Sequence, residues 1–170
     1  MTKLQSLIDR LKSTPMNVGT LKSLLPKDAI FKTLNDMKGS KSHVFGKHRC
    51  VVLLIPSKFS KIGHFVVLLR FPKYIEYFSS FGGRPESEMQ LMGQDSDTLK
   101  QLLGKNYTYN SLELQSKNTT IQDCALFVLA RIALRTLKLR EFQQLFKAKI
   151  VLNSPDDIVS MLTALLLVDL

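Results

Sequence analysis

Hydrophobic side chains recur at helical spacing near both ends of this 170-residue sequence and collect into short runs in its middle. Over residues 3–13, four leucines or isoleucines are spaced as one face of a helix, which predicts a helix that ends before Pro15. Residues 14–46 hold scattered prolines and glycines, and we expect short helices and loops there.

The middle of the chain predicts the strands of a sheet. Three apolar runs, rich in β-branched and aromatic residues, follow one another with only short polar or turn segments between them, which is typical of antiparallel strands. The third run is followed by Gly82-Gly83 and Pro85, a turn signal. The three runs cover residues 50–55, 65–69 and 74–78.

The second half predicts more helices. Residues 95–103 read as a helix, residues 107–114 as a further strand, and residues 124–137 as a helix that is apolar on nearly every side and therefore buried. A last helix is expected from Ser154, which can cap it. Helices, then strands, then helices indicate an α+β fold with helices packed on a mixed or antiparallel central sheet. Three cations of the buried helix form one stripe, read as a solvated face: Arg131, Arg135 and Lys138.

Length and composition fit a single domain, which we divide into an N-terminal helical region (1–46) and a core (47–170). No apolar run reaches the roughly 18 residues that a membrane-spanning helix needs, and no signal peptide is evident, so no membrane role is expected. Two cysteines cannot form a disulfide framework, which favours a reducing compartment. With only three histidines, neither a zinc site nor any other cofactor is expected.

The net charge of +10 is unevenly distributed. Residues 1–73 carry 14 basic and 3 acidic side chains, whereas residues 74–170 carry 10 basic and 11 acidic ones. A concentrated positive field attracts polyanions, above all nucleic acid, through phosphate contacts without sequence preference. The alternative is a lysine-rich surface that only keeps the protein soluble.

Two residues, Cys124 and His64, lie at positions that suit the nucleophile and the general base of a thiol enzyme. Cys124 begins the buried helix, where the helix dipole and free backbone N–H groups stabilise a thiolate and lower the pKa of the thiol. His64 lies at the start of a predicted strand and can serve as the general base for that thiol. The simpler reading is a small core cysteine and a structural histidine. Cys50 lies inside a strand-like run and is read as core.

Three motifs surround these residues: Gly63-His64-Phe65-Val66-Val67, Tyr77-Phe78-Ser79-Ser80-Phe81-Gly82, and Gln115 and Asn118 followed by Asp123-Cys124-Ala125-Leu126-Phe127. In their order along the chain, these motifs resemble the superfamily of adenovirus-type and SUMO/ubiquitin-like proteases. Short length and basic character make the chain most similar to the viral, adenain-like branch, with its virophage and large-DNA-transposon relatives. The resemblance covers about residues 48–137 and implies a papain-like or adenain-like cysteine-protease fold.

The resemblance implies a role for each matching residue. His64 would be the general base, Cys124 the nucleophile, and Gln115 an oxyanion-hole donor. Ser79 occupies the position of the acidic residue that orients the histidine. The family further implies capsid or core precursor proteins as substrates, location in the virion and the host-cell interior, whether nucleus or cytoplasmic virus factory, and stimulation by DNA or an activating peptide.

The sequence departs from the family pattern most clearly at Ser79, because a hydroxyl cannot stabilise an imidazolium as a carboxylate does. Glu76 is a poor replacement, since strand alternation puts it on the opposite face. On the resemblance as a whole, the leading hypothesis is a viral-type cysteine endopeptidase. Two alternatives stay open: a protease that removes ubiquitin-like proteins, and a non-catalytic basic virion protein that binds nucleic acid.

Overall fold

The computed structural model describes residues 16–115 and 124–147, together with positions 6, 9, 159, 160 and 163. The helix expected over residues 3–13 and the one expected from Ser154 lie largely outside the described residues. So do Asn118 and Asp123 of the third motif.

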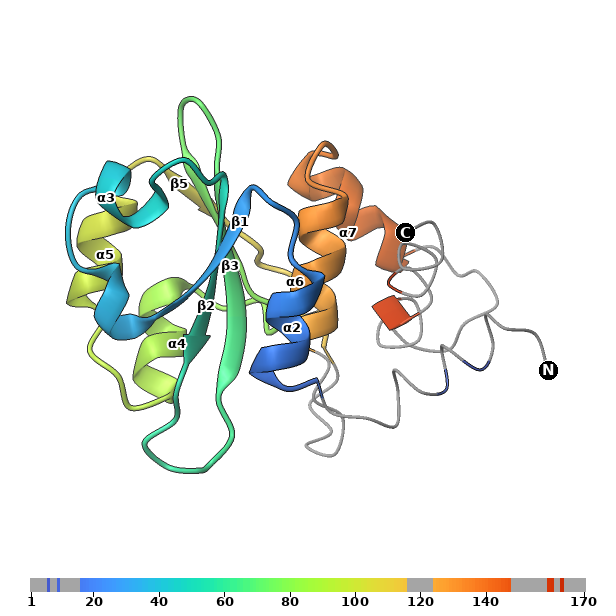
Figure 1. The fold of residues 1–170 in the computed structure, drawn as a ribbon, viewed down its shortest axis with the longest axis horizontal. Coiled ribbons are helices and arrows are strands. Elements are labelled where there is room, and N and C mark those ends of the chain that lie inside the picture. The colour runs from blue at the N-terminus through green and yellow to red at the C-terminus, as the bar shows by residue number, and fades with distance from the viewer. Residues whose placement is uncertain are drawn as a thin grey trace.

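A five-stranded mixed sheet forms the centre of the molecule, with the strands side by side in chain order (Figure 1). The three middle strands are antiparallel, as expected from the three apolar runs. Each outer strand pairs in parallel with its neighbour. The expected α+β class with a helix-covered mixed sheet is therefore confirmed. The strands are β1 (Ala29–Thr33), β2 (Cys50–Ile55), β3 (His64–Arg70), β4 (Ile75–Phe78) and β5 (Tyr107–Tyr109).

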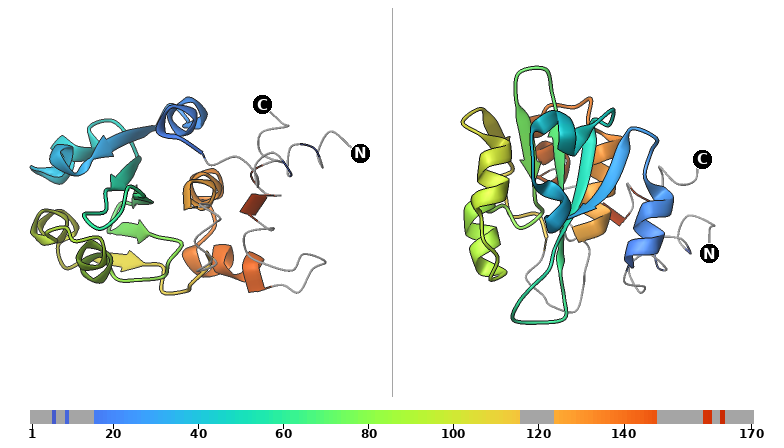
Figure 2. Two further views of the ribbon diagram at one scale, coloured as in Figure 1. Left: turned by 90° about the horizontal axis from the view of Figure 1, so that it is seen from below. Right: turned by 60° about the vertical axis from the view of Figure 1, so that its left-hand side comes forward.

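Helices cover both faces of the sheet (Figures 1 and 2). One face carries α2 (Val18–Leu24), α6 (Cys124–Ala133) and α7 (Leu139–Lys147). The other face carries the 3-10 helix η1 (Leu34–Met37), α3 (Lys41–Phe45), α4 (Pro85–Leu91) and α5 (Asp97–Leu103). Within the part of the chain that the structure describes, no helix is long and apolar enough to cross a bilayer.

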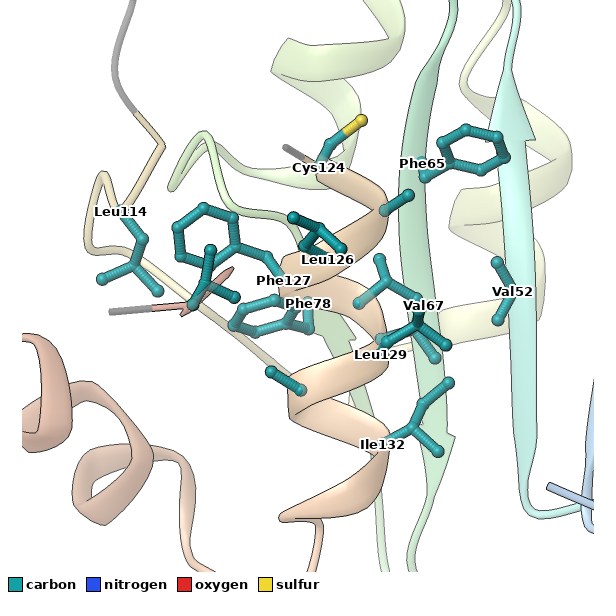
Figure 3. Packing of buried hydrophobic residues seen from close by; sticks show 14 of the residues in the cluster. Val52, Phe65, Val67, Phe78, Leu114, Cys124, Leu126, Phe127, Leu129 and Ile132 are labelled. Atoms are coloured by element: carbon teal, nitrogen blue, oxygen red, sulfur yellow. The ribbon is translucent and has the colours of Figure 1, made fainter. Parts of the chain in front are cut away.

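Strand alternation divides the core into two clusters. In β3, Phe65, Val67 and Leu69 face α6, whereas Val66 and Leu68 face α4 and α5. Figure 3 shows the first cluster, in which α6 lies along β3 and buries almost every side chain it has. The all-round apolar pattern of this helix is thus explained by its position between the sheet and α7.

Three sequence expectations need correction. The region 14–46 includes a strand, β1, which extends the sheet beyond β2. The segment after Gly82-Gly83 is not only a turn, because Pro85 begins helix α4. The predicted stripe of cations is solvated only in part: Arg131 is fully buried, where it pairs with Glu76 of β4, whereas Arg135 is half-buried and Lys138 is exposed.

Candidate active site

His64 is the first residue of β3, opposite Ile55 of β2, and its ring is buried. The ring stacks on Phe81, with the two ring centres 3.9 Å apart. Its Nε2 atom lies 2.8 Å from the Ser79 hydroxyl oxygen. The Nδ1 atom is buried and has no hydrogen-bond partner within the described residues. The structure therefore brings His64 and Ser79 together, as the resemblance implies.

Ser79 in turn contacts a carboxylate that the sequence did not single out. Its hydroxyl donates to Oε1 of Glu88, on helix α4, over 2.6 Å. The same Glu88 oxygen accepts from the backbone N–H of Gly83 at 3.1 Å. Its other oxygen accepts from the Tyr77 hydroxyl at 2.5 Å. Three donors thus converge on one buried carboxyl group, an arrangement suited to its ionised form.

These hydrogen bonds determine which nitrogen of His64 carries the proton. A serine hydroxyl has one hydrogen, and that of Ser79 is directed at Glu88. The Ser79 oxygen can then only accept from the ring, so Nε2 of His64 is protonated and Nδ1 holds the free lone pair. The structure therefore holds the His64 ring with Nδ1 as its accepting atom.

Burial shifts the pKa of both His64 and Glu88. Desolvation lowers the pKa of His64 to about 3, so the ring is neutral at physiological pH. Desolvation also raises the pKa of Glu88, while its bonds from Ser79, Tyr77 and Gly83 act in the opposite direction. A neutral imidazole is the state in which a general base accepts a proton.

Two glycines allow the chain to turn between Ser79 and Glu88. Gly82 adopts a φ of +74°, and a side chain there would collide with the backbone of Leu112 and Glu113. A Cβ at Gly83 would lie 2.8 Å from Cγ of Glu88. The Gly82-Gly83 pair is therefore needed for the close approach of the Glu88 carboxylate.

Gln115, the predicted oxyanion donor, is buried on the chain segment that leads toward α6. Its side-chain oxygen accepts from the Ser80 hydroxyl at 2.6 Å, and its backbone N–H donates to the Ser80 carbonyl at 3.0 Å. With the oxygen so engaged, the NH₂ group is the donor end of this amide. Ser80 directly follows Ser79, so Gln115 is tied to the same segment as the histidine network.

Cys124 begins α6, as expected, and is 6% exposed. Just beyond the far end of this helix, Arg135 lines the same cavity as Arg70, the last residue of β3. Helix and strand therefore run in the same direction, and Cys124 lies at the end of β3 where His64 stands. Figure 3 shows Cys124 at the same end as Phe65, the residue after His64.

The structure does not join the two residues by a hydrogen bond, because Nδ1 of His64 has no partner in the described part of the chain. Alternation puts His64 with Val66 on the α4 side of the sheet, whereas Cys124 belongs to the α6 side. Catalytic hydrogen bonds of free enzymes are often long and shorten only when substrate binds.

Glu88 was missed for two reasons. The glycines and proline before it read as a turn, and the helix that carries it has few apolar residues. One signal was present: Pro85 followed by two acidic residues is typical of a helix start. The expectation for Glu76 was correct, since it faces α6 and binds Arg131.

Two cavities lie at opposite ends of the described structure. One, of about 550 Å³, opens beside the histidine network and is lined by Phe81, Gly83, Ser87, Glu88, Leu91 and Glu113. The other, of about 590 Å³, lies near the end of α6 and is bordered by the cations Lys47, Arg49, Arg70 and Arg135. Among the described residues, no group of three or more His, Cys, Asp or Glu side chains could hold a metal ion.

Comparison with known proteins gives a distant likeness only. No protein-family model and no curated protein matches the sequence. Among solved structures, the SUMO protease Ulp1 with its catalytic cysteine oxidised to a sulfinic acid is similar at 15% identity and a TM-score of 0.39, over 99% of this chain and 95% of that one. The C-terminal Ulp1 protease domain in complex with Smt3, the yeast ortholog of SUMO, is similar at 12% identity and a TM-score of 0.36, over 96% of this chain and 76% of that one.

Proposed function

We propose that the protein is a cysteine peptidase in which Cys124 is the nucleophile and His64 the general base. The observation that supports this most is the state of His64: a buried, neutral ring whose Nε2–H is held by Ser79 and whose Nδ1 carries a free lone pair. A structural histidine would be expected to use both nitrogens when buried. Cys124 lies at the same end of the α6–β3 pair, at the helix start.

The proposed reaction is acyl transfer through a thioester. The Cys124 thiol gives its proton to Nδ1 of His64 while its sulfur bonds to the scissile carbonyl carbon. The carbon–nitrogen bond then breaks, and the imidazolium returns the proton to the leaving amine. Water attacks the thioester, with His64 again taking a proton, and the new carboxyl end and the free thiol are released. The NH₂ group of Gln115 and the backbone N–H of Cys124 would stabilise the oxyanion.

More narrowly, we propose a viral-type endopeptidase that cleaves capsid or core precursor proteins inside the virion and the infected cell. The motifs and the basic N-terminal half support this choice. DNA or an activating peptide would act as a stimulator, and neither a metal nor another cofactor is required by the chemistry above. Removal of ubiquitin-like proteins is the alternative substrate class.

The test is cleavage of peptides containing Gly-Gly or Gly-x-Gly, with and without duplex DNA, by the wild type and by Cys124→Ala. Cleavage that disappears in Cys124→Ala supports the proposal. Cys50→Ala is the matched control, because Cys50 is buried within β2, where its desolvated thiol has a pKa raised to about 11. Equal cleavage by Cys124→Ala and the wild type would refute the assignment.

The basic cavity favours nucleic-acid binding as a second function. Its four cations lie at the end of α6 away from Cys124, so a bound polyanion would leave the histidine network free. Affinity for random duplex DNA should fall steeply with salt, because each phosphate contact releases counterions. Replacing Arg49 and Arg70 by glutamate should weaken this binding. Unchanged DNA affinity in this variant would mean that DNA does not bind at this cavity.

A further inference from the structure

We propose that Glu88 is the missing carboxylate of the site: a positioning residue that acts on His64 through the Ser79 hydroxyl. The inference rests on the proposed function, since it gives His64 the role of general base. The chain of contacts is continuous, from Nε2 of His64 to the Ser79 oxygen over 2.8 Å and from that oxygen to Oε1 of Glu88 over 2.6 Å.

Ser79 alone could not stabilise the charged form of His64 as a carboxylate does. A neutral hydroxyl accepts a hydrogen bond from the ring but offers little stabilisation when the ring becomes charged. Because its own hydrogen points to a carboxylate, the hydroxyl dipole is aligned with its negative end toward His64. The charge of Glu88 then favours the imidazolium that forms in the transition state, and no proton has to pass through Ser79.

The hydrogen bonds to Glu88 favour its ionised form and do not cancel its charge. The residue is only 4% exposed, and its partners Tyr77, Ser79 and Gly83 are all neutral donors. Among the described residues, no lysine or arginine forms an ion pair with it. A buried carboxylate without a cation is costly, and it is normally retained only where the charge is used.

A purely structural role would leave a different signature. In that case Glu88 would only anchor the turn between β4 and α4, and any residue able to accept the same hydrogen bonds would serve. Glu88→Gln keeps the size and an accepting oxygen but removes the charge, so it separates the two roles. Glu86→Gln is the matched control, because Glu86 lies on the same helix. Within the described part of the chain, its carboxylate accepts a hydrogen bond only from the Tyr107 hydroxyl, at 3.5 Å.

The kinetic test uses the full chain on a peptide that the wild type cleaves. Glu88→Gln should lower kcat about 100-fold with little change in KM, because the lost charge acts only when His64 is protonated. Glu86→Gln should retain wild-type kcat. Equal rates for Glu88→Gln and Glu86→Gln would overturn the inference.

Moving the carboxylate from position 88 to position 79 by substitution sharpens this test. Ser79→Asp in the Glu88→Gln background puts a carboxylate directly beside Nε2 of His64 and should recover most of the lost kcat. Ser79→Asp in the wild-type background puts two carboxylates in contact and should be the poorer enzyme of the two. The opposite ranking would show that Glu88 anchors the turn and does not serve His64.

A spectroscopic measurement keeps the inference testable even if no peptide is cleaved. Nitrogen NMR of the imidazole groups should show His64 protonated at Nε2 in the wild type, and Ser79→Ala should remove this preference. In Glu88→Gln the Nε2–H proton resonance should move upfield, because the Ser79 oxygen becomes a weaker acceptor. An unmoved resonance in Glu88→Gln would refute the relay, whereas failure of Cys124→Ala to affect cleavage would refute only the proposed function.

Discussion

Two buried glutamates on opposite faces of the sheet solve the same electrostatic problem in different ways. Glu76 of β4 faces α6 and forms two hydrogen bonds to the Arg131 guanidinium, at 2.8 and 3.0 Å. That guanidinium also donates to the carbonyl oxygens of Leu134 and Leu137 and lies over the ring of Phe142. The charge is fully compensated.

Glu88 on the other face accepts three hydrogen bonds but has no cation among its described partners. Its surroundings solvate the carboxylate with neutral dipoles and do not neutralise it. A compensated carboxylate can hold elements together but cannot favour a new positive charge nearby, because its field is cancelled locally. The comparison teaches that the environment of a buried acid, rather than its burial, indicates whether its charge is used.

The largest expected effect is a loss of folding stability at low pH, caused by His64 in the network that contains Glu88. The pKa of His64 is lowered to about 3 in the folded protein, against an ordinary value of 6.5. The neutral His64 ring therefore contributes fully to the free energy of unfolding above pH 6.5. This contribution is lost as the pH falls from 6.5 toward 3, and the loss reaches up to about 5 kcal/mol. Urea unfolding across this range should show the slope, and His64→Gln should reduce it. An unchanged slope in His64→Gln would show that other groups cause it.

The next effect concerns the Glu76 side. Glu76→Gln leaves the Arg131 guanidinium buried without its counter-charge, which should lower the free energy of unfolding by about 3–5 kcal/mol. The matched control is Asp28→Asn, which breaks the half-exposed pair of Asp28 with Arg135 and should cost about 1 kcal/mol or less. Similar losses in the two variants would mean that burial does not distinguish these ion pairs.

The sequence predicted the parts of this comparison that depend on local pattern. The three middle strands are confirmed because each is rich in apolar residues and largely buried on both faces, although Glu76 interrupts the apolar run of β4. Helix α6 is confirmed, with Cys124 at its start, although it ends at Ala133 rather than 137. The predicted strand over 107–114 is shorter too, because β5 ends at Tyr109.

The missed parts depend on residues distant in sequence or on weak patterns. Arg131 looked solvated because its partner Glu76 lies 55 positions away and only the packed sheet brings them together. Strand β1 was missed because it is half-buried and holds a lysine, so it lacks the apolar alternation of a strand. Glu88 reaches Ser79 only because Gly82 and Gly83 let the chain fold back sharply, which no periodicity reveals.

The smallest effect is the one that decides the comparison. Glu88→Gln should change the free energy of unfolding at neutral pH by only about 1 kcal/mol. The Gln oxygen can accept from Ser79 and Gly83, and the Tyr77 hydroxyl can rotate to accept from the new NH₂ group. Removing the charge also relieves the desolvation that raises the pKa of Glu88.

The sign of the pH dependence follows from that raised pKa. A folded pKa above the unfolded value means that the protonated carboxyl favours folding at low pH and that this contribution is lost as the pH rises through the folded pKa. Glu88→Gln should therefore gain stability relative to the wild type as the pH rises from about 4 to 7, measured by urea unfolding. Glu76→Gln should remain destabilised at neutral pH. A loss in Glu88→Gln as large as that in Glu76→Gln would mean that both acids are structural anchors.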